Sequence, residues 1–337
     1  MGFNRACPAG ARSDQAHARA RWHRVENKEG RQAMNQKLAG IIIPAATPFD
    51  DQGYLSVEML EHNITKWNAT NVRGYMCLGS NGESRSLSDD ESITVVRQVM
   101  RLKADKTLIV GVGRESLHLT LAFLDRVTDL GPGIDYVSVL TPNYFAKLMD
   151  DEALVDYYRA VADHSPLPVL LYVAPGFANS VVLSPRAVRM LADHPNIHGL
   201  KDTTPAMMVD YMLSVGGRED FSVLAGSLNM LLTCLMLGGS GGVVSAANYF
   251  PAQCAEVTDL YFSGEHQEAV DRYLRLQRLV KQTGARRGVA GLKCCMNLCG
   301  FSGGKPRLPV KALAAQEESD IRAILSQTGS AQCVRLS

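Results

Sequence analysis

The chain has 337 residues, of which 46% are hydrophobic, and its formal net charge at pH 7 is +1. This length suits one large α/β domain or two smaller domains. The balanced charge argues against a broad surface for nucleic acid or anionic membranes, since such surfaces need a clustered basic excess. No apolar run approaches the length of a membrane span.

The first 37 residues differ in composition from the rest. They hold eight Lys or Arg residues and three acidic residues, a net charge of +5 that leaves −4 for the remaining chain. We expect a flexible N-terminal extension over residues 1–37, with Met34 near the functional start. An Arg-rich, acid-poor leader is also typical of a mitochondrial transit peptide, although this one holds little Ser and no clear amphipathic period. We therefore predict a cytoplasmic location, or a mitochondrial one if the leader is a transit peptide.

From residue 38 to residue 337 apolar runs alternate with amphipathic stretches, and we expect one domain with a C-terminal helical segment from about residue 250. Two stretches with helical patterns, Ser88–Lys103 and Ser184–Asp193, each begin with a Ser that suits an N-cap. Runs without alternation are typical of strands covered on both faces, as in a parallel sheet. The candidate strands are Ala39–Ala45, Gly74–Leu78, Thr107–Val112, Tyr136–Leu140, Pro168–Val173, Ile197–Leu200, Phe221–Ala225 and Gly242–Ser245.

Eight such units favour a closed (β/α)8 TIM barrel over an open, doubly wound sheet. No Gly-x-Gly-x-x-Gly sequence opens a helix after the first candidate strand, so the strongest signal for the open sheet is missing. In a barrel the residues at the C-terminal ends of the strands line the active site. The site residues are therefore expected at those ends.

The sixth candidate strand leads into a lysine, in the run Ile197-His198-Gly199-Leu200-Lys201. Burial disfavours an ammonium relative to a neutral amine, so a lysine inside the fold becomes a nucleophile. Such a lysine forms a Schiff base with a carbonyl substrate. The alternative is an edge-strand lysine that reaches into solvent.

The eight cysteines form no convincing metal or disulfide pattern. Cys294, Cys295 and Cys299 are close in sequence, but no Cys-x-x-Cys pair or nearby histidine completes a zinc set. We expect them to be small buried hydrophobic residues in a reducing compartment.

The residues at the strand ends form a specific pattern. Gly79-Ser80-Asn81-Gly82-Glu83 follows the second strand, Tyr172 stands before Pro175 at the fifth, and the Gly-x-Lys-Asp sequence that contains Lys201 ends the sixth. In this order and spacing the set resembles the dihydrodipicolinate synthase/N-acetylneuraminate lyase family of pyruvate-dependent class I aldolases. The resemblance extends from about Leu38 to the Lys305-Pro306-Arg307-Leu308-Pro309 segment.

The resemblance implies a role for each matching residue. Lys201 would form the pyruvate Schiff base, and Tyr172 would move protons during imine formation and carbon–carbon bond chemistry. Ser80 would link Tyr172 to a second tyrosine, Tyr144, which in the synthases reaches the site of a neighbouring subunit. A homotetramer arranged as a dimer of dimers is implied. The substrate-binding residues are predicted to be Gly79, Ser80, Asn81 and Val244.

The chemistry needs groups of these types. An iminium on Lys201 is an electron sink, so no metal or organic cofactor is predicted, and a tyrosine with a hydroxyl relay carries the proton. Backbone N–H groups of the Gly79–Gly82 turn suit the pyruvate carboxylate. The structural alternatives are that Tyr172 is a core aromatic and Ser80 a helix cap, and Glu83 is expected to support the turn rather than act as an acid.

Two departures from the family pattern bear on the substrate. Phe177 stands where the dihydrodipicolinate synthases have an arginine for the aldehyde carboxylate, and Asn81 replaces a second hydroxyl residue. The turn resembles instead that of the 4-hydroxy-2-oxoglutarate and 2-keto-3-deoxy-sugar-acid aldolases. We predict a lyase for a 4-hydroxy-2-oxo acid, with pyruvate and an aldehyde or 2-oxo acid as its small-molecule partners. The alternatives are 4-hydroxy-tetrahydrodipicolinate synthesis and a non-catalytic barrel that binds a 2-oxo acid.

Overall fold

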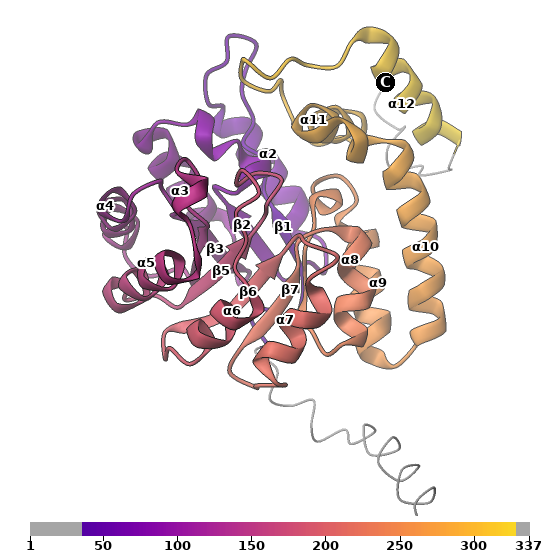
Figure 1. The fold of residues 1–337 in the computed structure, drawn as a ribbon. Helices are drawn as coiled ribbons and strands as arrows, with labels where there is room; N and C mark the ends of the chain where they lie inside the picture. The colour runs from indigo at the N-terminus through magenta and orange to yellow at the C-terminus, as the bar shows by residue number, and fades with distance from the viewer. Residues whose placement is uncertain (1–35, 328–337) are drawn as a thin grey trace, which may run out of the picture. The chain divides into compact units, whose positions relative to one another are not determined.

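A computed structural model describes residues 36–327, which contain a closed barrel of eight parallel strands in chain order (Figure 1). This confirms the predicted (β/α)8 fold. The strands are β1 (Gly40–Pro44), β2 (Gly74–Cys77), β3 (Thr107–Gly111), β4 (Tyr136–Leu140), β5 (Val169–Val173), β6 (Ile197–Asp202), β7 (Ser222–Ala225) and β8 (Gly241–Val243).

Helices surround the barrel, and further helices follow its last strand (Figure 1). The first seven are α2 (Val57–Asn68), α3 (Asp89–Leu102), α4 (Leu117–Thr128), α5 (Asp151–His164), α6 (Pro185–Ala192), α7 (Met208–Val215) and α8 (Leu228–Met236). After β8 come α9 (Pro251–Ser263), α10 (His266–Gln282), α11 (Gly288–Leu298) and α12 (Ala315–Gln327). Among residues 36–327 no helix has both the length and the apolar character needed to cross a membrane.

The helix starts follow the expected capping chemistry. The Ser88 hydroxyl accepts the Glu91 N–H, and the Glu91 carboxylate accepts the Ser88 N–H, which is a complete capping box at α3. The Ser184 hydroxyl caps α6 by accepting the Ala187 N–H, and Pro185 is the first helical residue. Both predicted helices therefore begin and end within one residue of the predicted bounds.

The barrel separates two hydrophobic clusters. The inner cluster fills the barrel with alternate strand residues such as Ile42, Met76, Ile109, Leu170 and Leu224. The outer cluster takes the residues between them and packs against the helices. Both faces of each strand are thus buried, which explains the continuous apolar runs in the sequence.

The ring of strands closes where β8 pairs with β1. Gly241 lies opposite Gly40 at this seam, with a φ of +153°, and a Cβ on Gly241 would lie 2.0 Å from the Gly40 carbonyl oxygen. The close approach leaves no room for a side chain. Glycine at this position is therefore part of what lets the barrel close.

One predicted strand is longer in the structure, and most of the predicted N-terminal extension lies outside the described residues. The sixth strand continues through Lys201 to Asp202, two residues beyond the predicted end, because neighbouring strands cover these polar side chains. The predicted leader, apart from Gln36 and Lys37, lies outside the described residues. The functional start at Met34 and the transit-peptide alternative also fall in that part of the chain.

Candidate active site

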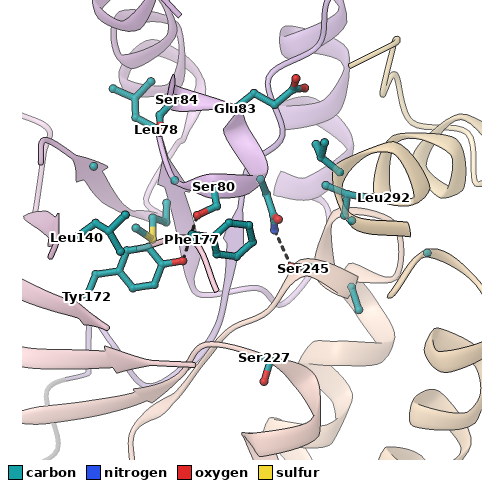
Figure 2. A pocket seen from close by; sticks show the side chains of 18 of the residues that line it. Leu78, Ser80, Glu83, Ser84, Leu140, Tyr172, Phe177, Ser227, Ser245 and Leu292 are labelled. Carbon is teal, nitrogen blue, oxygen red and sulfur yellow. Dashed lines mark hydrogen bonds between the residues drawn. The ribbon is translucent and has the colours of Figure 1, made fainter. Parts of the chain in front are cut away.

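A cavity of about 730 Å³ opens at the C-terminal ends of the strands. Its wall comes from the loops after β2, β5, β7 and β8 and, at the far side, from α10 and α11 (Figure 2). Predicted site residues in this wall are Gly79, Ser80, Asn81 and Tyr172. The cavity thus lies where a TIM barrel carries its active site.

Lys201 lies inside the barrel and not at an edge. The strand register places it between Tyr172 of β5 and Leu224 of β7, and its side chain is only 4% exposed. The Nζ atom lies 3.9 Å from the centroid of the Tyr172 ring and 3.6 Å from the Met76 sulfur. The solvent-exposed alternative for this lysine is wrong. Tyr172 and Met76 both line the cavity, so the amine lies directly against its wall.

Tyr172 and Ser80 meet across the barrel mouth. The two hydroxyl oxygens are 3.4 Å apart, and either can donate the hydrogen bond (Figure 2). Tyr172 is nearly buried, with its ring face on the Lys201 amine and its hydroxyl on the cavity. An amine, a phenol and an aliphatic hydroxyl are therefore in sequence, which is an arrangement that can relay a proton.

The turn that carries Ser80 is a single 3₁₀ turn over Ser80–Gly82. The Asn81 side-chain amide donates to the Ser245 hydroxyl at 2.7 Å, which joins the turn to the segment after β8 (Figure 2). Ser245 was not among the predicted site residues. Its position at the end of the eighth candidate strand was the available signal, because strand ends of a barrel converge on one site.

Glu83 ends this turn in the left-handed region, with φ of 51°, and its side chain points away from Ser80 and Tyr172 (Figure 2). Its carboxylate lies 2.6 Å from the Lys293 Nζ atom of α11 and accepts the Arg307 N–H at 3.0 Å. Burial lowers the pKa of Lys293, although the Glu83 carboxylate opposes that shift. Glu83 thus holds the turn, in agreement with its expected supporting role.

Two predicted site residues lie away from the cavity wall. Tyr144 is 76% exposed in the loop after β4, where its N–H donates to the Glu115 carboxylate. The Val244 side chain is fully buried in the outer hydrophobic cluster, and its carbonyl accepts the Ala247 N–H. Val244 was predicted to bind substrate, but it does not line the cavity, whereas Ser245 of the same segment does.

The charged side chains of the cavity wall are Glu83, which lies against Lys293, Arg85, which binds Glu115, and Lys281, which is exposed. The Arg85 guanidinium donates to the Glu115 carboxylate at 2.6 Å, and that carboxylate also accepts two backbone N–H groups. These hydrogen bonds and the Arg85 charge hold the pKa of Glu115 below its ordinary value despite the desolvation that opposes them. Phe177 lines the cavity and is 63% exposed. Neutral hydroxyl and amide groups from Ser227, Asn229 and Gln277 complete the polar wall.

Metal ligands are not gathered here, since residues 36–327 contain no group of three or more His, Cys, Asp or Glu side chains placed to hold an ion. Five of the six cysteines in this part of the chain are buried, and Cys294 is partly exposed. Burial raises the pKa of the Cys77 thiol to about 12.

Comparison with known proteins gives the same picture. The family model described as the Dihydrodipicolinate synthetase family matches residues 37–328. A probable 4-hydroxy-2-oxoglutarate aldolase, mitochondrial, from Emericella nidulans is 29% identical over 300 residues, which cover 86% of this chain and 95% of that protein. A 4-hydroxy-tetrahydrodipicolinate synthase from Listeria welshimeri is 31% identical over 291 residues, covering 86% of this chain and 98% of that protein.

Solved structures agree in fold. Dihydrodipicolinate synthase from Thermotoga maritima has a TM-score of 0.80 at 26% identity and covers 87% of this chain and 99% of its own. YagE, a prophage protein of the dihydrodipicolinic acid synthase family from E. coli K12 that was solved with pyruvate, has a TM-score of 0.79 at 26% identity and covers 86% of this chain and 98% of its own.

Proposed function

The chain belongs to the dihydrodipicolinate synthetase family, and from this premise we propose that it is a Schiff-base-forming lyase that cleaves or forms a 4-hydroxy-2-oxo acid with pyruvate as one product or substrate. The observation that carries the proposal is the placement of Lys201 inside the barrel, against the Tyr172 ring and next to the cavity. A buried amine beside a proton carrier is what imine chemistry requires.

In the cleavage direction Lys201 attacks the C2 carbonyl of the substrate, and loss of water gives an iminium. The proton of the C4 hydroxyl passes to the Tyr172 oxygen, the C3–C4 bond breaks, and its electrons pass into the iminium to give an enamine and an aldehyde. The enamine gains a proton at C3, and hydrolysis of the resulting iminium releases pyruvate and restores the amine. Ser80 relays protons to and from Tyr172 over their hydrogen bond.

The acceptor half of the substrate occupies the outer part of the cavity. Its lining includes neutral hydroxyl and amide groups, and its Arg85 is bound to Glu115, so it suits a hydroxylated aldehyde better than a free carboxylate. Within the predicted class this favours a 2-keto-3-deoxy sugar acid as the substrate. The other member of that class, 4-hydroxy-2-oxoglutarate, carries a second carboxylate on its acceptor half. The turn Gly79–Gly82 binds the pyruvate carboxylate through backbone N–H groups.

The assembly and location belong to the same proposal. Tyr144 reaches the site of a neighbouring subunit in a homotetramer, and its exposure in the single chain supports this role. The location is cytoplasmic, or mitochondrial if residues 1–37 act as a transit peptide.

Trapping of the imine tests the proposal. Borohydride reduction in the presence of pyruvate is expected to add a stable mass to the peptide that contains Lys201, because reduction converts the imine to a secondary amine. Lys201→Ala is expected to show no added mass, and Lys293→Met serves as a matched variant at a second buried lysine that keeps the label on Lys201.

A retro-aldol screen over 2-oxo-4-hydroxy acids, with released pyruvate as the readout, then identifies the acceptor. Labelling of another peptide, or none, would contradict the role of Lys201. Labelling without turnover of any such acid would support the non-catalytic alternative instead.

A further inference from the structure

Lys293 lies in α11, outside the barrel, yet it contacts the turn that carries Ser80. We propose that Lys293 is a positioning residue that acts through Glu83 to hold the Ser80 hydroxyl at Tyr172. This inference rests on the proposed function, because it assigns a task to the same proton relay. It concerns a side chain that touches neither the substrate nor the reacting atoms.

The Lys293 ammonium makes three contacts. Its side chain is 1% exposed, and Nζ lies 2.6 Å from the Glu83 carboxylate. It also donates to the Lys305 carbonyl at 3.0 Å and lies 4.3 Å from the centroid of the Phe49 ring. The chain passes tightly over α11 here, since a Cβ on Gly303 would lie 2.4 Å from the Lys293 carbonyl oxygen. The ammonium therefore has a single location, fixed from several sides.

Arg307 binds the same turn from the other side. Its N–H donates to Glu83, and its guanidinium donates to the Ser86 carbonyl at 2.6 Å and to the Gly53 carbonyl at 2.8 Å. The guanidinium also forms an ion pair with Glu91 of α3. The segment before α12 thus joins the loops after β1 and β2 to the C-terminal helices.

Glu83 connects Lys293 and Arg307 to Ser80 through the backbone of the turn. The Glu83 N–H donates to the Ser80 carbonyl at 3.1 Å, so the backbone of the turn and the ion pair share one residue. A Cβ on Gly82 would lie 3.1 Å from the Ala45 carbonyl oxygen, so the turn also lies close against the loop after β1. The Ser80–Tyr172 bond is already long, at 3.4 Å. A small displacement of the turn would therefore break it, and misplacement by about 1 Å typically costs about 10²-fold in rate.

Glu83 has two cationic residues as neighbours, and a second carboxylate binds one of them. Lys293 of α11 and Arg307 of the segment before α12 are the cations that face it, and Glu91 of α3 compensates Arg307. Removal of the Lys293 charge leaves the Glu83 carboxylate almost enclosed, at 5% side-chain exposure, beside a guanidinium that Glu91 already binds. The variant would therefore bury a carboxylate that lacks its ion-pair partner.

The experiment compares Lys293→Met, the double variant Glu83→Gln/Lys293→Met, and Lys305→Met as a matched control at a lysine that is 63% exposed. Lys293→Met is expected to keep borohydride trapping of pyruvate at Lys201 while kcat falls by about 10- to 10²-fold. Hydrogen exchange of the peptide with Ser80–Glu83 is expected to quicken, whereas Lys305→Met changes none of these.

If Lys293→Met does not fold, the double variant Glu83→Gln/Lys293→Met tests the positioning role instead, because it buries no carboxylate without a partner. Its kcat is expected to be about 10-fold or more below that of the parent protein, with trapping retained. Parent-like kcat together with unchanged exchange of the turn would overturn the positioning role. Absence of trapping in the parent protein would instead contradict the proposed function, and the exchange comparison would still decide whether Lys293 holds the turn.

Discussion

The Tyr172 hydroxyl is the one phenol that lies between the buried amine and Ser80 in the described site. Tyr172→Phe removes the proton carrier but keeps the ring that covers Lys201. We expect turnover to fall by about 10²-fold or more, the usual scale for a positioned acid or base, while pyruvate trapping persists. Steady-state kcat and trapped mass, measured on the same preparation, check this.

Tyr158→Phe is the control for Tyr172→Phe. Its hydroxyl is buried and donates to the Val139 carbonyl, outside the cavity wall, so its loss should leave kcat unchanged. Near-parent turnover of Tyr172→Phe would assign the proton transfer to another group.

We expect Phe177 to influence which acceptor is preferred, because it lines the cavity. An aromatic ring at the cavity mouth offers no hydrogen bond to a carboxylate, and loss of a charged hydrogen bond costs about 1.5–3 kcal/mol. When the contact persists in the transition state this equals about one to two powers of ten in kcat/KM. We expect a hydroxylated aldehyde to be preferred to aspartate semialdehyde when the two compete for pyruvate at equal concentration.

The matched variant is Phe177→Arg, which is expected to raise kcat/KM for aspartate semialdehyde and to leave the pyruvate reaction unchanged. A preference of the parent protein for aspartate semialdehyde would mean that another cation, such as Arg85 of the cavity wall, binds the acceptor. The 4-hydroxy-tetrahydrodipicolinate alternative would then be the better conclusion.

At the scale of elements, the end of β6 carries a buried carboxylate beside Lys201. Burial raises the pKa of Asp202 to about 6, against hydrogen bonds from Thr204 that lower it, and the Oδ2 atom has no partner among the described residues. The folded-state pKa lies above the ordinary value of 3.8, so the protonated form favours folding. The strand end is therefore destabilised progressively as the pH rises from about 4 to above 6.

Asp202→Asn is expected to relieve that cost, on the order of 3 kcal/mol from the shift to a pKa of about 6. Its Tm should exceed that of the parent protein at pH 8 and match it near pH 4, by thermal unfolding at both values. Asp156→Asn, at an exposed helix position, should change Tm little at either pH. A Tm difference that does not change with pH would contradict the titration of Asp202.

Site residues can be predicted from the sequence where the residues that identify them are neighbours in the chain. Ser88 with Glu91, or Lys201 in an apolar run, can be recognised because the informative residues are neighbours. Glu83 and Lys293 are far apart in sequence and belong to no spacing rule, so their ion pair appears only after the chain has folded. Val244 was misplaced for a related reason, since a shift of one residue along a strand end reverses the face on which a side chain lies.

For the whole molecule, the loop after β4 presents apolar side chains to solvent. Tyr144, Phe145 and Leu148 are each at least 65% exposed in the single chain. We expect a homotetramer in solution, because such clusters are typical of surfaces that another subunit covers. Sedimentation velocity should give a tetramer for the parent protein and a smaller species for Phe145→Ser/Leu148→Ser.

A matched control is Leu213→Ser, at an exposed leucine of α7 outside this loop, which should remain a tetramer. A monomeric parent protein with normal turnover would contradict both the assembly and the role of Tyr144. At this scale the sequence predicted the barrel from its eight apolar runs but held no local signal for a subunit contact.

The pairing of β8 with β1 also bears on when the parts of the site come together as the chain folds. The cavity takes residues from the loop after β2, near the start of the barrel, and from the segment after β8, near its end. The hydrogen bond from Asn81 to Ser245 joins these two parts of the chain, and Ser245 follows the strand in which Gly241 pairs with Gly40. We therefore expect catalytic competence to arise late in folding, because contacts between the first and last strands close the longest loops.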